Sequence, residues 1–158
     1  MFPRRLLSLP ATAAVLLAAS GCSSTDAPAS ITVPSPPPEE KALCRALHEA
    51  LPESVAGKDR QDPEPRSELT AGWGDAAIVL RCGVPRPAGL TDWRADGVEV
   101  EGVEWYAEEL KDSARFTTTY RRTYVEVTLS KRFGDVGPLT ELAGPVTKTV
   151  PPLFSETP

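Results

Sequence analysis

Apolar residues at helical spacing predict a helix early in the chain, over residues 39–51. Leu43, Leu47 and Leu51 fall on one face of this helix, and Cys44 lies beside them. Two glutamates at its start suit the positive end of the helix dipole, and a proline directly after it favours an end there. We therefore expect the helix to pack on the rest of the chain through its leucines and its cysteine.

The middle of the chain carries strand patterns. Residues 53–74 are polar and rich in turn-forming residues, which predicts a surface loop. Residues 76–83 are a short, nearly continuous apolar run, and their β-branched content favours a buried central strand. Residues 98–100 and 103–105 then flank a Glu-Gly pair that is typical of a tight turn, so a hairpin is expected there.

Polar and apolar residues alternate in the next pair of predicted strands, at 114–120 and 123–129. One face of the second strand is apolar, and we expect it to be buried: Val125, Val127 and Leu129. A Gly-Pro pair at 137–138 can begin a helix, because proline is tolerated at the first helical position. A second Gly-Pro pair, at 144–145, is expected to interrupt this helix before residues 146–150.

The first residues of the chain have the pattern of an export signal. Arg4 and Arg5 give a positive start, and the apolar stretch after them is shorter than the roughly 20 residues that a membrane-spanning helix needs. The following sequence LAASGC, at residues 17–22, resembles the lipobox of bacterial lipoproteins, in which the cysteine receives the lipid. We therefore expect a signal peptide at 1–21 and a mature chain that begins at an acylated Cys22.

Two points about the export signal stay open. An ordinary secretory signal, cleaved after Ala29, is the alternative to the lipoprotein signal. The two adjacent arginines do not decide between the general and the twin-arginine export routes, because such pairs are common in any signal peptide.

The cysteine count supports the lipid assignment. Three cysteines are an odd number, which needs an explanation in an exported protein. If Cys22 carries the lipid, Cys44 and Cys82 remain as a pair, and an oxidising compartment favours a disulfide between them. The alternative is two buried free thiols. A disulfide would fasten the first predicted helix to the central strand.

These elements predict one domain. Residues 22–38, rich in serine and proline, predict an extended tether. Residues 39–152 predict a single α+β domain, with an antiparallel sheet of four to five strands, an N-terminal helix disulfide-linked to a central strand and a short C-terminal helical segment. Residues 153–158 form a tail. A chain of 158 residues leaves no room for a two-lobed binding protein.

The net charge of the chain bears on which molecules it can bind. The 17 basic and 22 acidic residues give a formal charge of −5, which argues against nucleic acid, since a binder of phosphates needs a positive patch. Loss of the two N-terminal arginines makes the mature chain more acidic still, so we expect the lipid to provide its membrane contact. An envelope protein or a cell-wall component remains as a possible partner.

Few residues suggest catalysis. The chain lacks a Gly-x-Ser-x-Gly motif, a P-loop, an HExxH motif and EF-hand spacing, and a Ser-His-Asp triad would depend on the single histidine, His48. Strand alternation would scatter the largest acidic cluster over two faces, so we interpret it as solvated surface: Glu99, Glu101, Glu104, Glu108, Glu109 and Asp112. We predict no cofactor and no metal.

One segment, Gly72-Trp73-Gly74-Asp75, offers two interpretations. The two glycines let the backbone turn tightly around a large aromatic side chain. Trp73 either fills one end of the core, with Asp75 capping the turn, or forms a small-ligand site together with Asp75.

Five segments, taken together, resemble a family of actinobacterial lipoproteins that is known as domain of unknown function 3515. They are LTAGWGD (69–75), IVLRCGVP (78–85), GVEW (102–105), RFTT (115–118) and YVEV (124–127). The resemblance covers residues 42–152, with Ala76 standing where a proline is expected. It implies a lipoprotein signal and an extracytoplasmic domain, and it implies no activity.

These observations together predict a lipid-anchored protein at the extracytoplasmic face of the cell membrane. We expect it to act as a non-catalytic interaction module of the cell envelope. A small-ligand-binding module that uses Trp73 and Asp75 is the alternative, and a hydrolase is the less favoured one.

Overall fold

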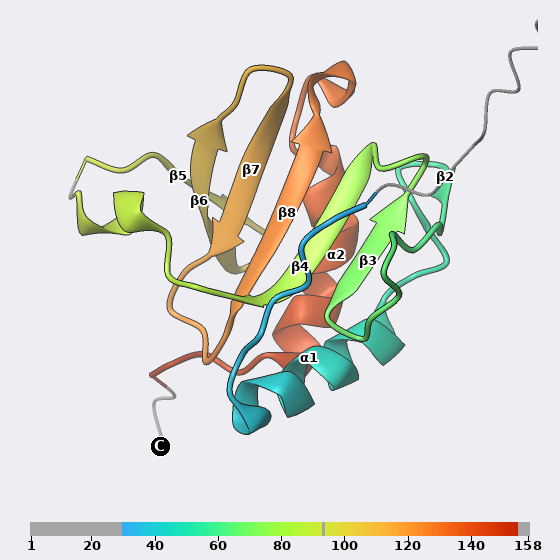
Figure 1. Cartoon of the computed structure of the whole chain (residues 1–158). Coiled ribbons are helices and arrows are strands. Elements are labelled where there is room, and N and C mark those ends of the chain that lie inside the picture. Colours follow the sequence, from blue (N-terminus) through green and yellow to red (C-terminus); the bar gives the residue numbers. More distant parts are fainter. Residues whose placement is uncertain (1–29, 93, 155–158) are drawn as a thin grey trace, which may run out of the picture.

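The computed structural model describes residues 30–92 and 94–154, so the predicted signal peptide, Cys22 and most of the predicted tail lie outside the described residues. The chain has an α+β fold with two α-helices and two antiparallel sheets (Figure 1). The large sheet has six strands in the order β3-β4-β8-β7-β6-β5: Thr70–Trp73, Ile78–Val84, Tyr124–Ser130, Ser113–Thr118, Val103–Glu109 and Gly97–Val100. The predicted fold class is confirmed, whereas four to five strands was too few.

The strands that the sequence analysis missed lie in the segment predicted as a loop, residues 53–74. β1 (Ser54–Val55) and β2 (Lys58–Asp59) pair with each other as a two-stranded sheet, and β3 forms one edge of the large sheet. All four residues of β3 are buried, so the strand has no polar–apolar alternation to reveal it. It also contains alanine and glycine, which are rare in strands.

α1 agrees with the helix predicted from the sequence, whereas α2 differs from its prediction. α1 (Pro38–Ala50) begins and ends within one residue of the predicted helix. α2 (Gly137–Thr149) starts at the predicted Gly-Pro pair but continues through Pro145, so the predicted interruption was wrong. Leu142 and Val146, on either side of this proline, are fully buried. Burying such side chains contributes about 1.5–3 kcal/mol each, which offsets the cost of about 3 kcal/mol for a proline inside a helix.

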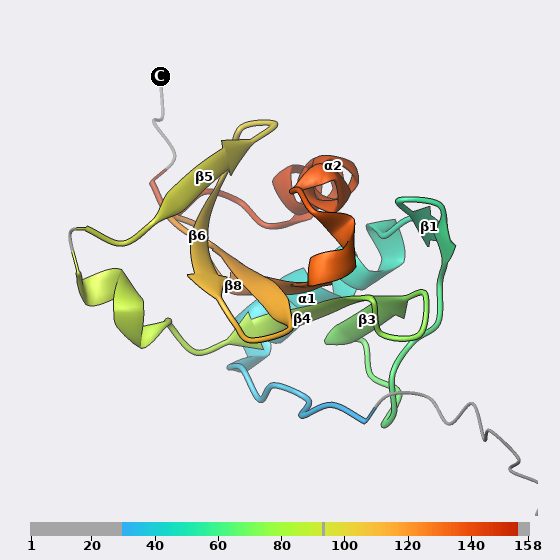
Figure 2. The ribbon, with the colours of Figure 1, turned by 90° about the horizontal axis from the view of Figure 1, so that it is seen from above.

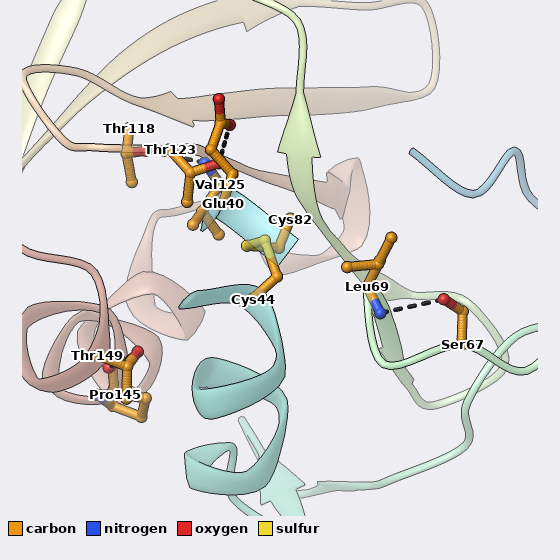
Figure 3. Close-up of a disulfide and its surroundings, with 10 residues drawn as sticks. All are labelled: Glu40, Cys44, Ser67, Leu69, Cys82, Thr118, Thr123, Val125, Pro145 and Thr149. Atoms are coloured by element: carbon orange, nitrogen blue, oxygen red, sulfur yellow. Dashed lines mark hydrogen bonds between the residues drawn. A yellow bond between two sulfur atoms is a disulfide. The ribbon is translucent and has the colours of Figure 1, made fainter. Parts of the chain in front are cut away.

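Both helices lie on one side of the large sheet (Figures 1 and 2). The apolar face of β8 points to this side, and its three residues are 0%, 0% and 2% exposed, as the alternation predicted: Val125, Val127 and Leu129. α1 is joined to β4 by a disulfide between Cys44 and Cys82, whose Cα atoms are 5.5 Å apart (Figure 3). The predicted link between the first helix and a central strand is therefore confirmed.

Residues 30–37 cross the opposite face of the sheet, in front of β4 (Figures 1 and 2). We call these residues the strap. The Ile31 N–H donates to the Glu64 carbonyl at 3.0 Å, and Pro36 lies so close to Gly83 that a Cβ added to this glycine would clash with the proline ring. The part of the predicted tether that is described thus packs on the domain.

The predicted hairpin after the central strand is present. β5 and β6 pair through a two-residue turn, in which Glu101 and Gly102 have φ angles of 47° and 74°. Among residues 30–92 and 94–154, no helix combines the length and the apolar character needed to cross a membrane.

Candidate functional site

Trp73 and Asp75 differ in their surroundings. Trp73 is fully buried at the end of β3, and its indole N–H donates to the Pro52 carbonyl at 3.1 Å. Asp75 is exposed in the turn to β4, where its backbone N–H donates to the Gln61 side chain at 3.0 Å. Neither residue lines any of the hollows described below. Trp73 thus serves as a core residue, with its one polar atom already bonded.

His48 lines an open hollow of about 510 Å³ beside Arg60. The Arg60 Nη2 atom lies 3.3 Å from Nδ1 and 3.1 Å from Nε2 of the imidazole, so the guanidinium faces the ring. The Nε atom of Arg60 pairs with Asp62 at 2.9 Å, and its guanidinium lies 5.9 Å from the centre of the Trp73 ring. A triad histidine needs a carboxylate that orients it, and here a cation takes that place.

A row of ion pairs crosses the face of the sheet that is turned away from the helices. Glu126 of β8 is 8% exposed and pairs with Arg81 of β4 at 3.3 Å and with Arg115 of β7 at 3.6 Å. Arg115 also reaches Glu108 of β6 at 3.9 Å. Two cations face two anions, so the row has little net charge to attract a ligand. The sequence did not predict this row, because its four residues come from four different strands.

A group of carboxylates lies beside the β5 edge of the large sheet. A hollow of about 460 Å³ lies between β5, β6 and the segment that includes the short helix η1 (Ala88–Thr91). Four carboxylates line it, and among its described lining residues there is no Lys, Arg or His: Asp92, Asp96, Glu99 and Glu104. We call it the acidic hollow.

Strand register contributes to the charge of this hollow. Glu99 of β5 lies directly opposite Glu104 of β6, and like charges in such cross-strand positions destabilise a sheet. The Tyr106 phenol also lines the hollow; partial desolvation, and then the carboxylates of Glu108, Asp96 and Asp92, raise its pKa. A positively charged group in the hollow would relieve this repulsion.

The acidic cluster predicted from the sequence is therefore divided. Glu99 and Glu104 share the hollow, whereas Glu108 pairs with Arg115 and Glu109 pairs with Lys131 at 3.4 Å. Asp92 and Asp96 complete the hollow from a connecting segment, and sequence reasoning missed them because only the folded chain brings that segment to β5. Among the described residues, no group of three or more His, Cys, Asp or Glu side chains is placed to hold a metal ion.

Apolar side chains are exposed next to the acidic hollow. Tyr120, Leu153 and Phe154 are 64%, 53% and 74% exposed and line a smaller hollow of about 230 Å³. Tyr120 and Leu90 line both hollows, so the apolar and acidic surfaces are continuous. Such an exposed apolar patch beside polar groups is typical of interaction sites.

Comparison with known proteins gives a family and no relative of known role. No curated protein and no solved structure shows significant similarity to the chain. A family model described as "Protein of unknown function (DUF3515)" matches residues 6–153, which is nearly the whole chain, and the protein therefore belongs to this family.

Proposed function

We propose that the protein is a bacterial lipoprotein of the actinobacterial kind that its sequence resembles. In this proposal the chain is exported, its signal peptide is removed, and an acylated Cys22 holds it at the extracytoplasmic face of the cell membrane. The domain then acts as a non-catalytic interaction module that contacts another envelope protein or a cell-wall component.

The disulfide is the observation that carries this proposal. Cys44 and Cys82 are each 1% exposed, and their bond joins the first helix to a central strand of the sheet. Structural disulfides persist in oxidising compartments and are rare in the cytosol of ordinary bacteria. The bond also uses two of the three cysteines, which leaves Cys22 in its lipobox sequence as the third.

The surface of the domain supports a role in binding another molecule. The candidate catalytic histidine faces Arg60, and the charges in the row of ion pairs on the sheet neutralise one another. The acidic hollow and the apolar patch beside it, in contrast, offer a continuous surface of carboxylates and exposed apolar side chains.

The anchor is tested by the substitution Cys22→Ala in the producing cell. We expect the wild-type protein to sediment with membranes and to carry a diacylglyceryl group at Cys22, which mass spectrometry of the N-terminal peptide detects. We expect the variant to lose the lipid and to leave the membrane fraction. Cys22→Ser, which keeps the size of the side chain but removes the thiol, serves as the control and should behave like the alanine variant. A wild-type protein that is soluble, with a mature N-terminus after Ala29, would contradict the proposal.

A further inference from the structure

We infer that β5 is a docking edge, at which an extended, basic segment of a partner protein adds as a further strand of the large sheet. The partner segment would place lysine or arginine side chains toward the acidic hollow. This inference rests on the proposed role as an interaction module, and it names the class of partner and the place of contact.

The backbone of β5 has free hydrogen-bonding groups on its outer side. The Ala107 N–H donates to the Asp96 carbonyl at 2.9 Å, and the antiparallel register then pairs Val98 with Trp105 and Val100 with Val103. Because hydrogen-bonded positions alternate along an antiparallel strand, the N–H and C=O groups of Gly97 and Glu99 point away from β6. Both residues are exposed, so a partner strand can reach them.

The opposite edge of the sheet is protected, which distinguishes β5. At β3, the Gln61 N–H donates to the Gly72 carbonyl at 2.8 Å, and the Gly74 N–H donates to the Asp59 carbonyl at 3.1 Å. No described residue outside β6 hydrogen-bonds to β5 in this way. An uncovered edge strand is a template for pairing with another chain, and proteins normally cover or block such edges.

The charge of the acidic hollow indicates which side chains the partner segment carries. In a strand added to β5, alternate side chains face the two sides of the sheet. On one side they meet Glu99 and the other carboxylates of the acidic hollow, and on the helix side they meet Val98 and Val100, which belong to the apolar core or pack against it. The best partner segment therefore alternates basic with apolar residues.

A second copy of this chain fits the edge less well. Two β5 strands side by side would bring Glu99 and its neighbours on both copies together, and like charges in adjacent strands repel. The net charge of −5 adds to this repulsion. The acidic hollow thus favours a basic partner over self-association.

The test uses the purified full-length protein and two blocked hexapeptides as probes, one alternating lysine with valine and one alternating glutamate with valine. We expect the lysine peptide to bind at least about tenfold more tightly than the glutamate peptide, and its affinity to fall as salt rises. Hydrogen exchange measured by NMR locates the contact. The amides of Gly97 and Glu99 should become protected on binding, whereas the amide of Val98, already bonded to β6, should change little.

Two variants separate backbone pairing from charge. Glu99→Pro removes an outward N–H, and proline is tolerated at such edge positions, so the variant should fold and lose about tenfold or more in affinity. Glu99→Gln keeps the N–H and removes only the charge, so it should lose roughly threefold. Circular dichroism checks that both variants fold; if Glu99→Pro does not, Gly97→Pro makes the same test at the other outward N–H.

Three results would overturn the inference: equal binding of the two peptides, protection of amides elsewhere on the chain, or unchanged affinity of the folded proline variant. Protection of Gly97 and Glu99 without peptide, together with a dimer in sedimentation, would assign the edge to a second copy instead. None of these results depends on the lipid at Cys22, so the docking edge and the anchor can fail separately.

Discussion

Thr117 and Thr118 are neighbours in β7 that are equally buried and differ in hydrogen bonding. Both are 0% exposed. The Thr118 hydroxyl oxygen accepts a hydrogen bond from the Val125 N–H at 2.9 Å (Figure 3), whereas the Thr117 hydroxyl has no partner among the described residues. A buried polar group without a partner carries a desolvation cost that a bonded one does not.

Substitution by valine, which has nearly the same shape, separates these two cases. Thr117→Val should leave the free energy of unfolding unchanged or raise it by up to about 1 kcal/mol, because no hydrogen bond is lost. Thr118→Val should lower it by about 1–3 kcal/mol, because the buried Val125 N–H then has no partner. Urea unfolding of the two variants measures both values. Equal losses would mean that the Thr117 hydroxyl has a partner in solution.

At the scale of elements, the strap depends on a glycine in β4. Gly83 has a φ angle of +84° and lies at a register shift between β4 and β8, against Pro36 of the strap. Gly102, in the β5–β6 turn, has a similar φ of +74° and no atom within 4 Å of an added Cβ. Alanine at either position is strained, but only at Gly83 does it also displace the strap.

We therefore expect Gly83→Ala to be the more destabilising of the two variants. Gly102→Ala should cost about 1–2 kcal/mol from backbone strain alone, and Gly83→Ala should cost at least about 1 kcal/mol more. Urea unfolding gives the difference. Faster hydrogen exchange at the Ile31 amide, which bonds to Glu64, should show that the strap has separated in the Gly83 variant and not in the Gly102 control. Unchanged exchange at Ile31 would show that the sheet, and not the strap, adapts.

The elements that could be predicted are those with a periodic pattern. The leucines of α1, the alternation in β8 and the Glu-Gly turn after β5 each follow from local sequence, and the structure has all three. β3 could not be predicted, because its four residues have no alternation and include alanine and glycine, which are depleted in strands. The uninterrupted α2 could not be predicted either, since the burial that outweighs Pro145 comes from tertiary packing.

The candidate site was only partly visible in the sequence. Glu99 and Glu104 belong to the acidic cluster that the sequence contains, but their direct opposition depends on the register of β5 and β6. Asp92 and Asp96 come from a connecting segment whose path no local pattern determines. The free edge of β5 is a property of strand order, which sequence periodicity does not give. Trp73 was a candidate ligand-binding residue because the local sequence does not show that its indole N–H donates to the Pro52 carbonyl.

For the whole molecule, the disulfide joins segments that are 38 residues apart in sequence. Closing a loop of about 39 residues lowers the entropy of the unfolded chain, which contributes about 4 kcal/mol in the chain-entropy model. We expect the double substitution Cys44→Ala with Cys82→Ala to lower the free energy of unfolding by up to that amount, measured by urea denaturation under oxidising conditions. Addition of a reductant should destabilise the wild type and leave the double variant unchanged, which controls for effects of packing. A variant as stable as the wild type would show that α1 is held by packing alone.

The strap and the docking edge lie at different ends of the strand order. The strap crosses β4 next to the β3 edge, and β5 is the last strand on the other side (Figure 1). A chain held at its amino end and bound at β5 would therefore have the whole width of the sheet between its anchor and its partner.

The disulfide also sets the route of mechanical load through the protein. Tension applied at the amino end reaches Cys44 through the strap and the first turns of α1, and then passes across the sulfur–sulfur bond into β4 at Cys82. Residues 45–81 lie between the bonded cysteines, so pulling cannot extend them while the bond is intact. β1, β2 and β3 belong to this segment, so the covalent path of the load bypasses them. Under load, the strap and the first turns of α1 would peel away first, and residues 45–81 would not lengthen while the bond is intact.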